Sequence, residues 1–200
     1  MAITNWEIIT NEGFIHGIDF SSGLNLPGSF CYATELVSGP SLIALKNKII
    51  TNRANIKVTA YIRKECNNLE PFIFLRYDDT SGEAYVLKLE SNINLYKLDL
   101  KDKISIPSQQ PIKQGTTTIL LNTSYHISFY SYTLIDGSTV FECGLHNGTI
   151  WVNEFSHVLD PDIDSGDIGF GTFYKFGSIS SGCKKSYFDN IEILSPIVFV

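Results

Sequence analysis

The sequence predicts an all-β protein: one domain, residues 1–200, in which two antiparallel sheets pack face to face with at most one or two short helices. Three observations support this. Apolar and polar residues alternate along many short segments, and strand signals recur about every 8–12 residues. Aromatic residues reach 12%, with 10 Tyr and 13 Phe, a composition typical of strands. A chain of 200 residues is also long enough to bury one sizeable core.

The first part of the chain gives the weakest signals. Residues 1–28 are expected to form an irregular or strand-like lead-in, with a first strand at residues 5–9 and Trp6 filling the core. A second strand is predicted at residues 29–36. Residues 41–50 are the best helix candidate, because their apolar positions cluster loosely on one face. The same apolar residues fit a strand equally well.

The alternation becomes clear from residue 56 onward. Residues 56–63 predict a strand with apolar side chains on one face. Residues 72–77 and 84–90 predict a hairpin, because the polar segment 78–82 (DDTSG) between them is typical of a turn. Residues 94–100 alternate as a half-exposed strand does.

The next segment, residues 101–114, is polar and holds two prolines, so we expect a surface loop. Four further strands are then predicted, at residues 116–121, 125–134, 140–145 and 149–152. The sequence His-Asn-Gly at 146–148 indicates a hairpin turn. An acidic turn follows at residues 160–166.

Two alternating segments close the chain, residues 168–174 and 187–193. Gly169 and Gly171 leave one face of the first segment almost without side chains, so another backbone or a ligand could lie close to it. Asp189 interrupts an otherwise apolar segment, and a polar group placed there needs a partner.

These segments carry a resemblance. The pair SGDIGFGT and SYFDNIEI, preceded by FLRYDD and AYVLKLE, resembles the concanavalin A-like lectin and glucanase superfamily, especially its laminin-G-like branch. The resemblance covers roughly residues 56–194. It implies a jelly-roll sandwich in which the hairpin strands pair in the middle of a curved sheet.

Composition and charge restrict the classes of function. The net charge of −6 argues against a nucleic-acid binder, which needs a basic surface. The chain shows no signal peptide and no membrane span, so we expect synthesis in the cytoplasm. Cys31, Cys66, Cys143 and Cys183 are far apart and form no C-x-x-C pair. Two disulfides are compatible with four cysteines, but buried free thiols are the favoured interpretation.

The residues give little support for catalysis. Glucanases of the superfamily carry a Glu-x-Asp-x-x-Glu strand, and no Glu in this sequence has an Asp two places later. No G-x-S-x-G, H-E-x-x-H or nucleotide-binding motif is present, and none of the four histidines has an evident nucleophile. The sequence therefore predicts a protein without catalytic activity.

Calcium is the one cofactor that the sequence suggests, because Ca²⁺ prefers carboxylate and carbonyl oxygens from turns. The acidic turn supplies Asp160, Asp162 and Asp164. The resemblance adds Asp189, since similar carbohydrate-binding jelly rolls hold a structural calcium with an aspartate near the last strand. Alternatively, Asp189 or Asn190 simply bonds the backbone of the N-terminal strand.

A sugar site needs an aromatic platform and a few polar groups. The predicted aromatic residues are Trp151, Tyr130, Tyr132, Tyr77 and Tyr174, and the predicted polar partners are Arg76, Asp78 and Asn153. The alternative is that most of these aromatics fill the core, because alternation alone does not say which face is exposed.

The favoured function is a non-catalytic, lectin-like module that binds carbohydrate or a cell surface. The alternative is a bacteriophage virion or tail protein, which the apolar tail from Ser195 to Val200 suggests as a docking segment for assembly partners. A glycoside hydrolase that uses Asp160 or Glu142 is the least favoured hypothesis.

Overall fold

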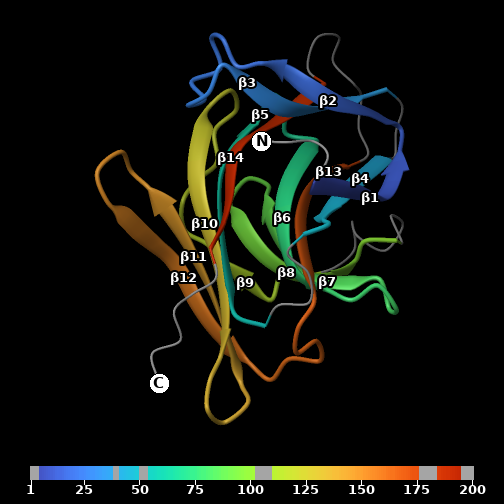
Figure 1. Ribbon diagram of the computed structural model, residues 1–200. Helices are drawn as coiled ribbons and strands as arrows, with labels where there is room; N and C mark the ends of the chain where they lie inside the picture. The colour runs from blue at the N-terminus through green and yellow to red at the C-terminus, as the bar shows by residue number, and fades with distance from the viewer. Residues whose placement is uncertain (1–4, 38–40, 50–53, 102–109, 176–183, 195–200) are drawn as a thin grey trace.

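The computed structural model describes residues 5–37, 41–49, 54–101, 110–175 and 184–194 (Figure 1). In these residues the chain forms two sheets of seven antiparallel strands each. The strands are β1 (Trp6–Glu12), β2 (Phe14–Phe20), β3 (Phe30–Leu36), β4 (Ser41–Asn47), β5 (Ile56–Lys64), β6 (Leu69–Tyr77), β7 (Glu83–Leu89), β8 (Ile93–Asp99), β9 (Lys113–Gln114), β10 (Ser124–Thr133), β11 (Thr139–His146), β12 (Trp151–Leu159), β13 (Asp167–Tyr174) and β14 (Lys185–Leu194). The all-β prediction with two antiparallel sheets is confirmed.

The strand order shows how the end of the chain closes the sandwich. Sheet A has the order β1-β4-β13-β6-β7-β8-β9, and sheet B has the order β12-β11-β10-β5-β14-β3-β2. The last two strands therefore lie inside the sheets: β13 joins β4 to β6, and β14 joins β5 to β3 (Figure 1). Each links strands from the beginning of the chain to strands from its middle.

The core between the sheets is built around Phe170 of β13. Its ring lies 4.7 Å from Trp6, 5.2 Å from Tyr32 and 4.7 Å from Phe188, measured between ring centroids. These residues come from both sheets and are at most 9% exposed. Burying such side chains contributes roughly 1.5–3 kcal/mol each. The prediction that Trp6 fills the core is confirmed.

Sheet A buries its outer face as well as its inner face. The second cluster includes Leu42, Phe72, Phe74, Leu98 and Phe173, each at most 1% exposed. Residues 94–100 are therefore not a half-exposed strand. Leu95 faces the main core while Leu98 belongs to this outer layer, and both are buried. The prediction was wrong because alternation distinguishes two faces but does not show that one of them meets water.

Gly169 and Gly171 allow close packing inside sheet A. A Cβ atom on Gly169 would lie 1.9 Å from the Leu45 carbonyl oxygen and 2.4 Å from the Phe74 ring. A Cβ atom on Gly171 would lie 2.1 Å from the Ile43 carbonyl oxygen. All three distances are far below van der Waals contact, so neighbouring backbone, together with the Phe74 ring, fills the space that the glycines leave. This confirms one of the two occupants that the sequence suggested.

Residues 41–49, the described part of the helix candidate 41–50, do not form a helix. Residues 41–47 form β4, which pairs with β1 on one side and β13 on the other. Six of its seven residues are buried, because both faces of sheet A are covered. A strand buried on both faces loses its apolar–polar alternation. Its sequence therefore cannot be distinguished from a short buried helix by periodicity.

Two further corrections concern strands. The lead-in contains a second strand, β2, which pairs with β3 along its whole length. Residues 116–121 form no strand; there, Thr116 and Thr117 donate backbone N–H groups to the Glu154 carboxylate at 3.0 and 2.9 Å. A side chain thus replaces the strand partner that the pattern predicted.

The predicted hairpins are confirmed, since β6 pairs with β7 and β11 pairs with β12. Cys31 and Cys143 are free, buried thiols, as predicted, while Cys183 lies outside the described residues. Burial raises the pKa of Cys31 to about 11. The tail from Ser195 to Val200 and residues 102–109 of the predicted loop also lie outside. Where the chain is described, no helix has the length and apolar character to cross a bilayer.

Candidate functional site

The outer face of sheet B carries a groove over strands β5, β10, β11 and β12. The register between the paired strands arranges the side chains of the groove in rows. Lys57 and Glu142 both lie opposite Tyr130, which places these three side chains in one row. His146 lies opposite both His126 and Trp151, which places them in a second row. The two rows form the walls, because side chains two residues apart along a strand share a face.

Small residues form the floor between the walls. Ser128 lies opposite Gly144, and Gly144 lies opposite Asn153. A Cβ atom on Gly144 would lie 2.9 Å from the Ser128 hydroxyl oxygen and 3.6 Å from the Trp151 ring. An added Cβ atom would therefore crowd the Ser128 hydroxyl, while its contact with the Trp151 ring would be an ordinary van der Waals contact. The result is an open hollow of about 260 Å³.

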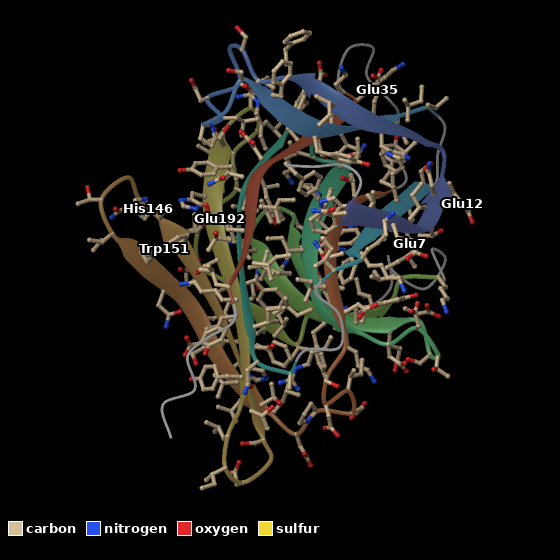
Figure 2. The ribbon with its side chains drawn as sticks, viewed as in Figure 1. Glu7, Glu12, Glu35, His146, Trp151 and Glu192 are labelled. Carbon is tan, nitrogen blue, oxygen red and sulfur yellow. The ribbon has the colours of Figure 1, made fainter. Side chains whose placement is uncertain are left out.

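The wall formed by the row of His126, His146 and Trp151 is aromatic. Trp151 is 39% exposed, and its ring centroid lies 4.6 Å from His126 and 5.2 Å from His146. Tyr61 stacks on His126 at 4.1 Å with an interplanar angle of 9°. Figure 2 shows Trp151 beside His146 near the end of the β11–β12 hairpin. The neighbouring rings hold Trp151 in place, so its exposed surface is a platform ready for a planar apolar partner.

The wall formed by the row of Lys57, Tyr130 and Glu142 combines aromatic and charged groups. The Tyr130 and Tyr132 rings lie 4.9 Å apart. The Tyr132 hydroxyl donates to the Glu142 carboxylate at 3.1 Å, and the Ser156 hydroxyl lies 3.4 Å from the same oxygen. Burial raises the pKa of Tyr130, and the Glu142 charge raises it further. The Lys57 ammonium lies 5.4 Å from the centroid of the Trp151 ring, so the two walls meet at this point.

A β-bulge in β12 sets the direction of the Trp151 strand end. The register shifts between Cys143 and Gly144, so Phe155 pairs with Cys143 while Asn153 pairs with Gly144. Glu154 is the extra residue and is 9% exposed. Its four hydrogen bonds to Thr116 and Thr117 fix the bulge, and they lower its pKa although burial opposes this.

Among the predicted sugar-binding residues, the structure brings together four. Trp151, Tyr130 and Asn153 line the groove, and Tyr132 lies next to Tyr130. Asp78 is in the turn between β6 and β7, where it accepts the N–H groups of Thr80 and Ser81.

The other predicted residues lie inside the fold. Tyr77 is 1% exposed and packs in the outer layer of sheet A, and Tyr174 is 4% exposed and packs in the main core. Arg76 is 0% exposed, so its guanidinium does not face solvent. These positions share the strand pattern of the groove residues but point into the protein, and the sequence pattern does not distinguish the two directions.

Arg76 joins loops from several parts of the chain. Its guanidinium donates to Thr139 Oγ1 at 2.9 Å, the Ile163 carbonyl oxygen at 3.1 Å, the Ala54 carbonyl oxygen at 2.9 Å and Thr133 Oγ1 at 3.0 Å. It also lies 5.6 Å from the Phe141 ring centroid. Its backbone has φ of 55°, a left-handed conformation that costs a non-glycine residue roughly 1–2 kcal/mol. The side-chain contacts offset this cost.

The predicted calcium ligands are already engaged or exposed. Asp189 Oδ2 accepts the Gly28 N–H at 3.0 Å, and Oδ1 accepts the Asn190 N–H at 2.7 Å. Asp162 pairs with Lys97 at 2.6 Å, whereas Asp160 and Asp164 are exposed. The described residues contain no group of three or more His, Cys, Asp or Glu able to hold a metal ion. The donor set at Asp189 therefore does not fit calcium, and the alternative role, binding the N-terminal backbone, is the one observed.

A buried ionic cluster in sheet A was missed by the sequence reasoning. Lys88 lies 2.7 Å from Glu70 and 3.0 Å from Glu90, and Lys88 and Glu70 are at most 3% exposed. The Tyr96 hydroxyl donates to Glu90 at 2.6 Å. Burial raises the pKa of Glu70, while Lys88 opposes the shift. Lys88 and Glu70 are closed from solvent and Glu90 is only 17% exposed at its side chain, so this network links strands of the sheet and is not part of the groove.

Lys57, Ser128 and Gly144 are groove residues that the sequence reasoning also missed. Their signal is the register of β5, β10 and β11, which sets Lys57 opposite Tyr130 and Ser128 opposite Gly144. A single sequence predicts the strands but not which residues pair across them. The small floor therefore becomes visible only in the folded sheet.

Solved structures share this fold. No family model and no curated protein matches the sequence. The carbohydrate-binding module CBM66 from Bacillus subtilis superposes with a TM-score of 0.63 at 9% identity, covering 94% of both chains. An endo-β-1,4-glucuronan lyase from the fungus Trichoderma reesei gives 0.59 at 7% identity, covering 97% of this chain and 92% of that one.

A Ca²⁺-bound form of the VIP36 exoplasmic/lumenal domain gives a TM-score of 0.59 at 8% identity, covering 98% of this chain and 85% of that one. At these identities the similarity shows the fold alone. The chain thus has the jelly-roll sandwich fold that the sequence resemblance implied, and that fold occurs both in a carbohydrate-binding module and in an enzyme.

Proposed function

We propose that the protein is a non-catalytic, lectin-like module that binds carbohydrate in the Trp151 groove, the hollow on sheet B lined by Lys57, Tyr130, Glu142, Trp151 and Asn153. The observation that carries this proposal is the exposed Trp151 ring, held by His126 and His146 above a floor of small residues. An aromatic ring stacks on the C–H face of a pyranose, and nearby polar groups bind its hydroxyls.

The polar groups are suitably placed for this task. Glu142 offers a carboxylate acceptor, Lys57 an ammonium donor and Asn153 an amide, and all three line the same hollow as Trp151. The similarity in fold to a carbohydrate-binding module supports this proposal.

A glycan array and titration calorimetry test the proposal. Wild-type protein is expected to bind at least one glycan, and Trp151→Ala is expected to weaken binding at least about tenfold, since truncating a central aromatic residue costs about 2 kcal/mol or more. Phe20→Ala is the matched control, because Phe20 is a 70% exposed aromatic residue of β2 and lies outside the groove lining. Binding that survives Trp151→Ala but is lost in Phe20→Ala would contradict the assignment.

The other functions remain predictions from the sequence. The tail from Ser195 to Val200, which suggested virion assembly, lies outside the described residues, and none of the solved structures named above is a virion protein. For a hydrolase, Asp160 is exposed in its turn, whereas Glu142 lies in the groove. Turnover of a polysaccharide that is abolished by Glu142→Gln would support that alternative. Cytoplasmic synthesis also stays a prediction.

A further inference from the structure

The Trp151 groove contains a lysine, Lys57, that has no ion-pair partner among the residues that the structure describes. The Lys57 ammonium lies 5.4 Å from the centroid of the Trp151 ring. Two other lysines on the outer faces of the sheets are paired: Lys46 with Asp79, and Lys185 with Asp19. Lys57 therefore differs from them by having an aromatic ring in place of a carboxylate.

The carboxylate in the same groove is held away from Lys57. Glu142 accepts the Tyr132 hydroxyl at 3.1 Å and lies 3.4 Å from the Ser156 hydroxyl. Tyr130 lies between Lys57 and Glu142 in the strand register, so their backbones are two strand spacings, about 10 Å, apart. The groove is thus positive at the Lys57 end and negative at the Glu142 end, with Trp151 next to the positive end.

We propose that the Trp151 groove selects carboxylate-bearing sugars, and that Lys57 binds the carboxylate while the sugar ring stacks on Trp151. This inference rests on the proposed function and specifies its ligand class. A hexuronate combines an apolar C–H face with an anionic group at the edge of its ring. Those two features match an exposed indole ring and an adjacent ammonium group that forms no ion pair with any residue in the described ranges. Glu142 is left to accept hydroxyl groups of the neighbouring sugar.

The test compares acidic sugars with neutral forms of the same size. Tetramers of 1,4-linked galacturonate, glucuronate, mannuronate and guluronate, each with its methyl ester, are titrated into the full chain at 0.15 M and 1 M NaCl. At least one acid is expected to bind about fivefold more tightly than its ester, the upper range for an exposed ion pair. Because salt screens exposed charges, the preference is expected to shrink at 1 M NaCl.

Substitutions identify the residue responsible. Lys57→Gln is expected to abolish the preference for the acid, and Lys57→Arg is expected to keep it. Lys113→Gln is the matched control, because Lys113 is an exposed lysine of β9 in the other sheet and its loss changes the net charge equally. Thermal melts establish that each variant is folded.

The outcomes separate this inference from the function beneath it. Trp151-dependent binding in which every ester binds as tightly as its acid overturns the acidic specificity and leaves carbohydrate binding standing. An acid preference that persists in Lys57→Gln overturns the role of Lys57. If no glycan, neutral or acidic, binds in a Trp151-dependent manner, the proposed function itself is overturned.

Discussion

The carboxylate of Asp189 accepts the backbone N–H of Gly28 at 3.0 Å, although the two residues are 161 positions apart in the chain. Asp189 is 8% exposed and sits where the register between β14 and β5 shifts. Asn190 follows with φ of 45°. A β-bulge in the closing strand thus turns one carboxylate toward the loop between β2 and β3 and attaches that loop to the sheet.

Removing this contact is expected to destabilise the fold. Asp189→Ala leaves the Gly28 and Asn190 N–H groups without their acceptor, which costs about 1–3 kcal/mol in the free energy of unfolding. Urea denaturation measures the loss. Asp160→Ala is the matched control, since that aspartate is exposed and is expected to change stability by no more than about 0.5 kcal/mol. Equal stability of both variants would show that the Asp189 contact is unimportant.

Calcium addition is expected to have little effect, because both Asp189 oxygens accept N–H donors. A ligand that binds only the folded state stabilises it by RT ln(1 + [L]/Kd), so a real site would raise the melting temperature as calcium rises above its dissociation constant. The measurement is the melting temperature in EDTA and in millimolar CaCl₂, expected to be equal. An increase with calcium that disappears in Asp189→Ala would restore the site that the sequence suggested.

The strands were more predictable from the sequence than the site was. Alternation gave β5 and the β6–β7 hairpin, because these segments have a distinct pattern and clear turn residues. It failed at β4, where both faces are buried. The sequence also identified Trp151 and Tyr130 as aromatic candidates. It did not show that Arg76 and Tyr77 point inward.

The remainder depends on pairing between distant strands. The floor of the groove exists because Ser128 meets Gly144, and the platform stands beside it because a bulge shifts the β11–β12 register at Gly144. Register and bulges are set by contacts across the sheet rather than by local sequence. A single chain without its fold therefore shows the residue types of the site but not their arrangement.

Arg76 is expected to act on stability rather than on ligand binding. Arg76→Lys keeps the charge but loses the planar fork that reaches four acceptors, so we expect a loss of about 2–4 kcal/mol in the free energy of unfolding. Affinity for a glycan, measured on the folded variant, is expected to remain within about twofold. A stable variant with lost binding would instead place Arg76 in the ligand site.

The Lys88 cluster is expected to be strongly coupled. Lys88→Met leaves Glu70 and Glu90 facing each other without their cation, which costs about 3–5 kcal/mol. In the double variant Lys88→Met with Glu70→Gln, part of this loss is expected to return, because one of the two unpaired carboxylates is gone. A double-mutant cycle measured by urea denaturation gives the coupling energy. Additive effects would show that Lys88 and Glu70 are energetically independent.

Stability is expected to fall as the pH drops below about 6.5, the ordinary pKa of histidine. Burial lowers the pKa of His16, and it lowers the pKa of His126, where His146 and Lys57 act in the same direction and Glu192 opposes them. The unfolded chain therefore binds protons on these histidines before the folded chain does. Between the pKa of a histidine in the unfolded chain and its lower pKa in the folded chain, the free energy of unfolding falls by at most about 1.4 kcal/mol per pH unit for each histidine. Below the folded-state pKa that histidine causes no further loss.

The histidine variants isolate this effect from the carboxylates, since the raised pKa of Glu70 gives a slope of the opposite sign. His126→Phe keeps a ring against Tyr61 and Trp151 but has no proton to gain. The free energy of unfolding, measured between pH 7.5 and pH 5, is expected to fall less steeply in this variant than in the wild type, and less again when His16→Gln is added. Parallel curves for all three proteins would mean that the two histidines titrate alike in the folded and unfolded states, and that burial in sheet B does not set their charge.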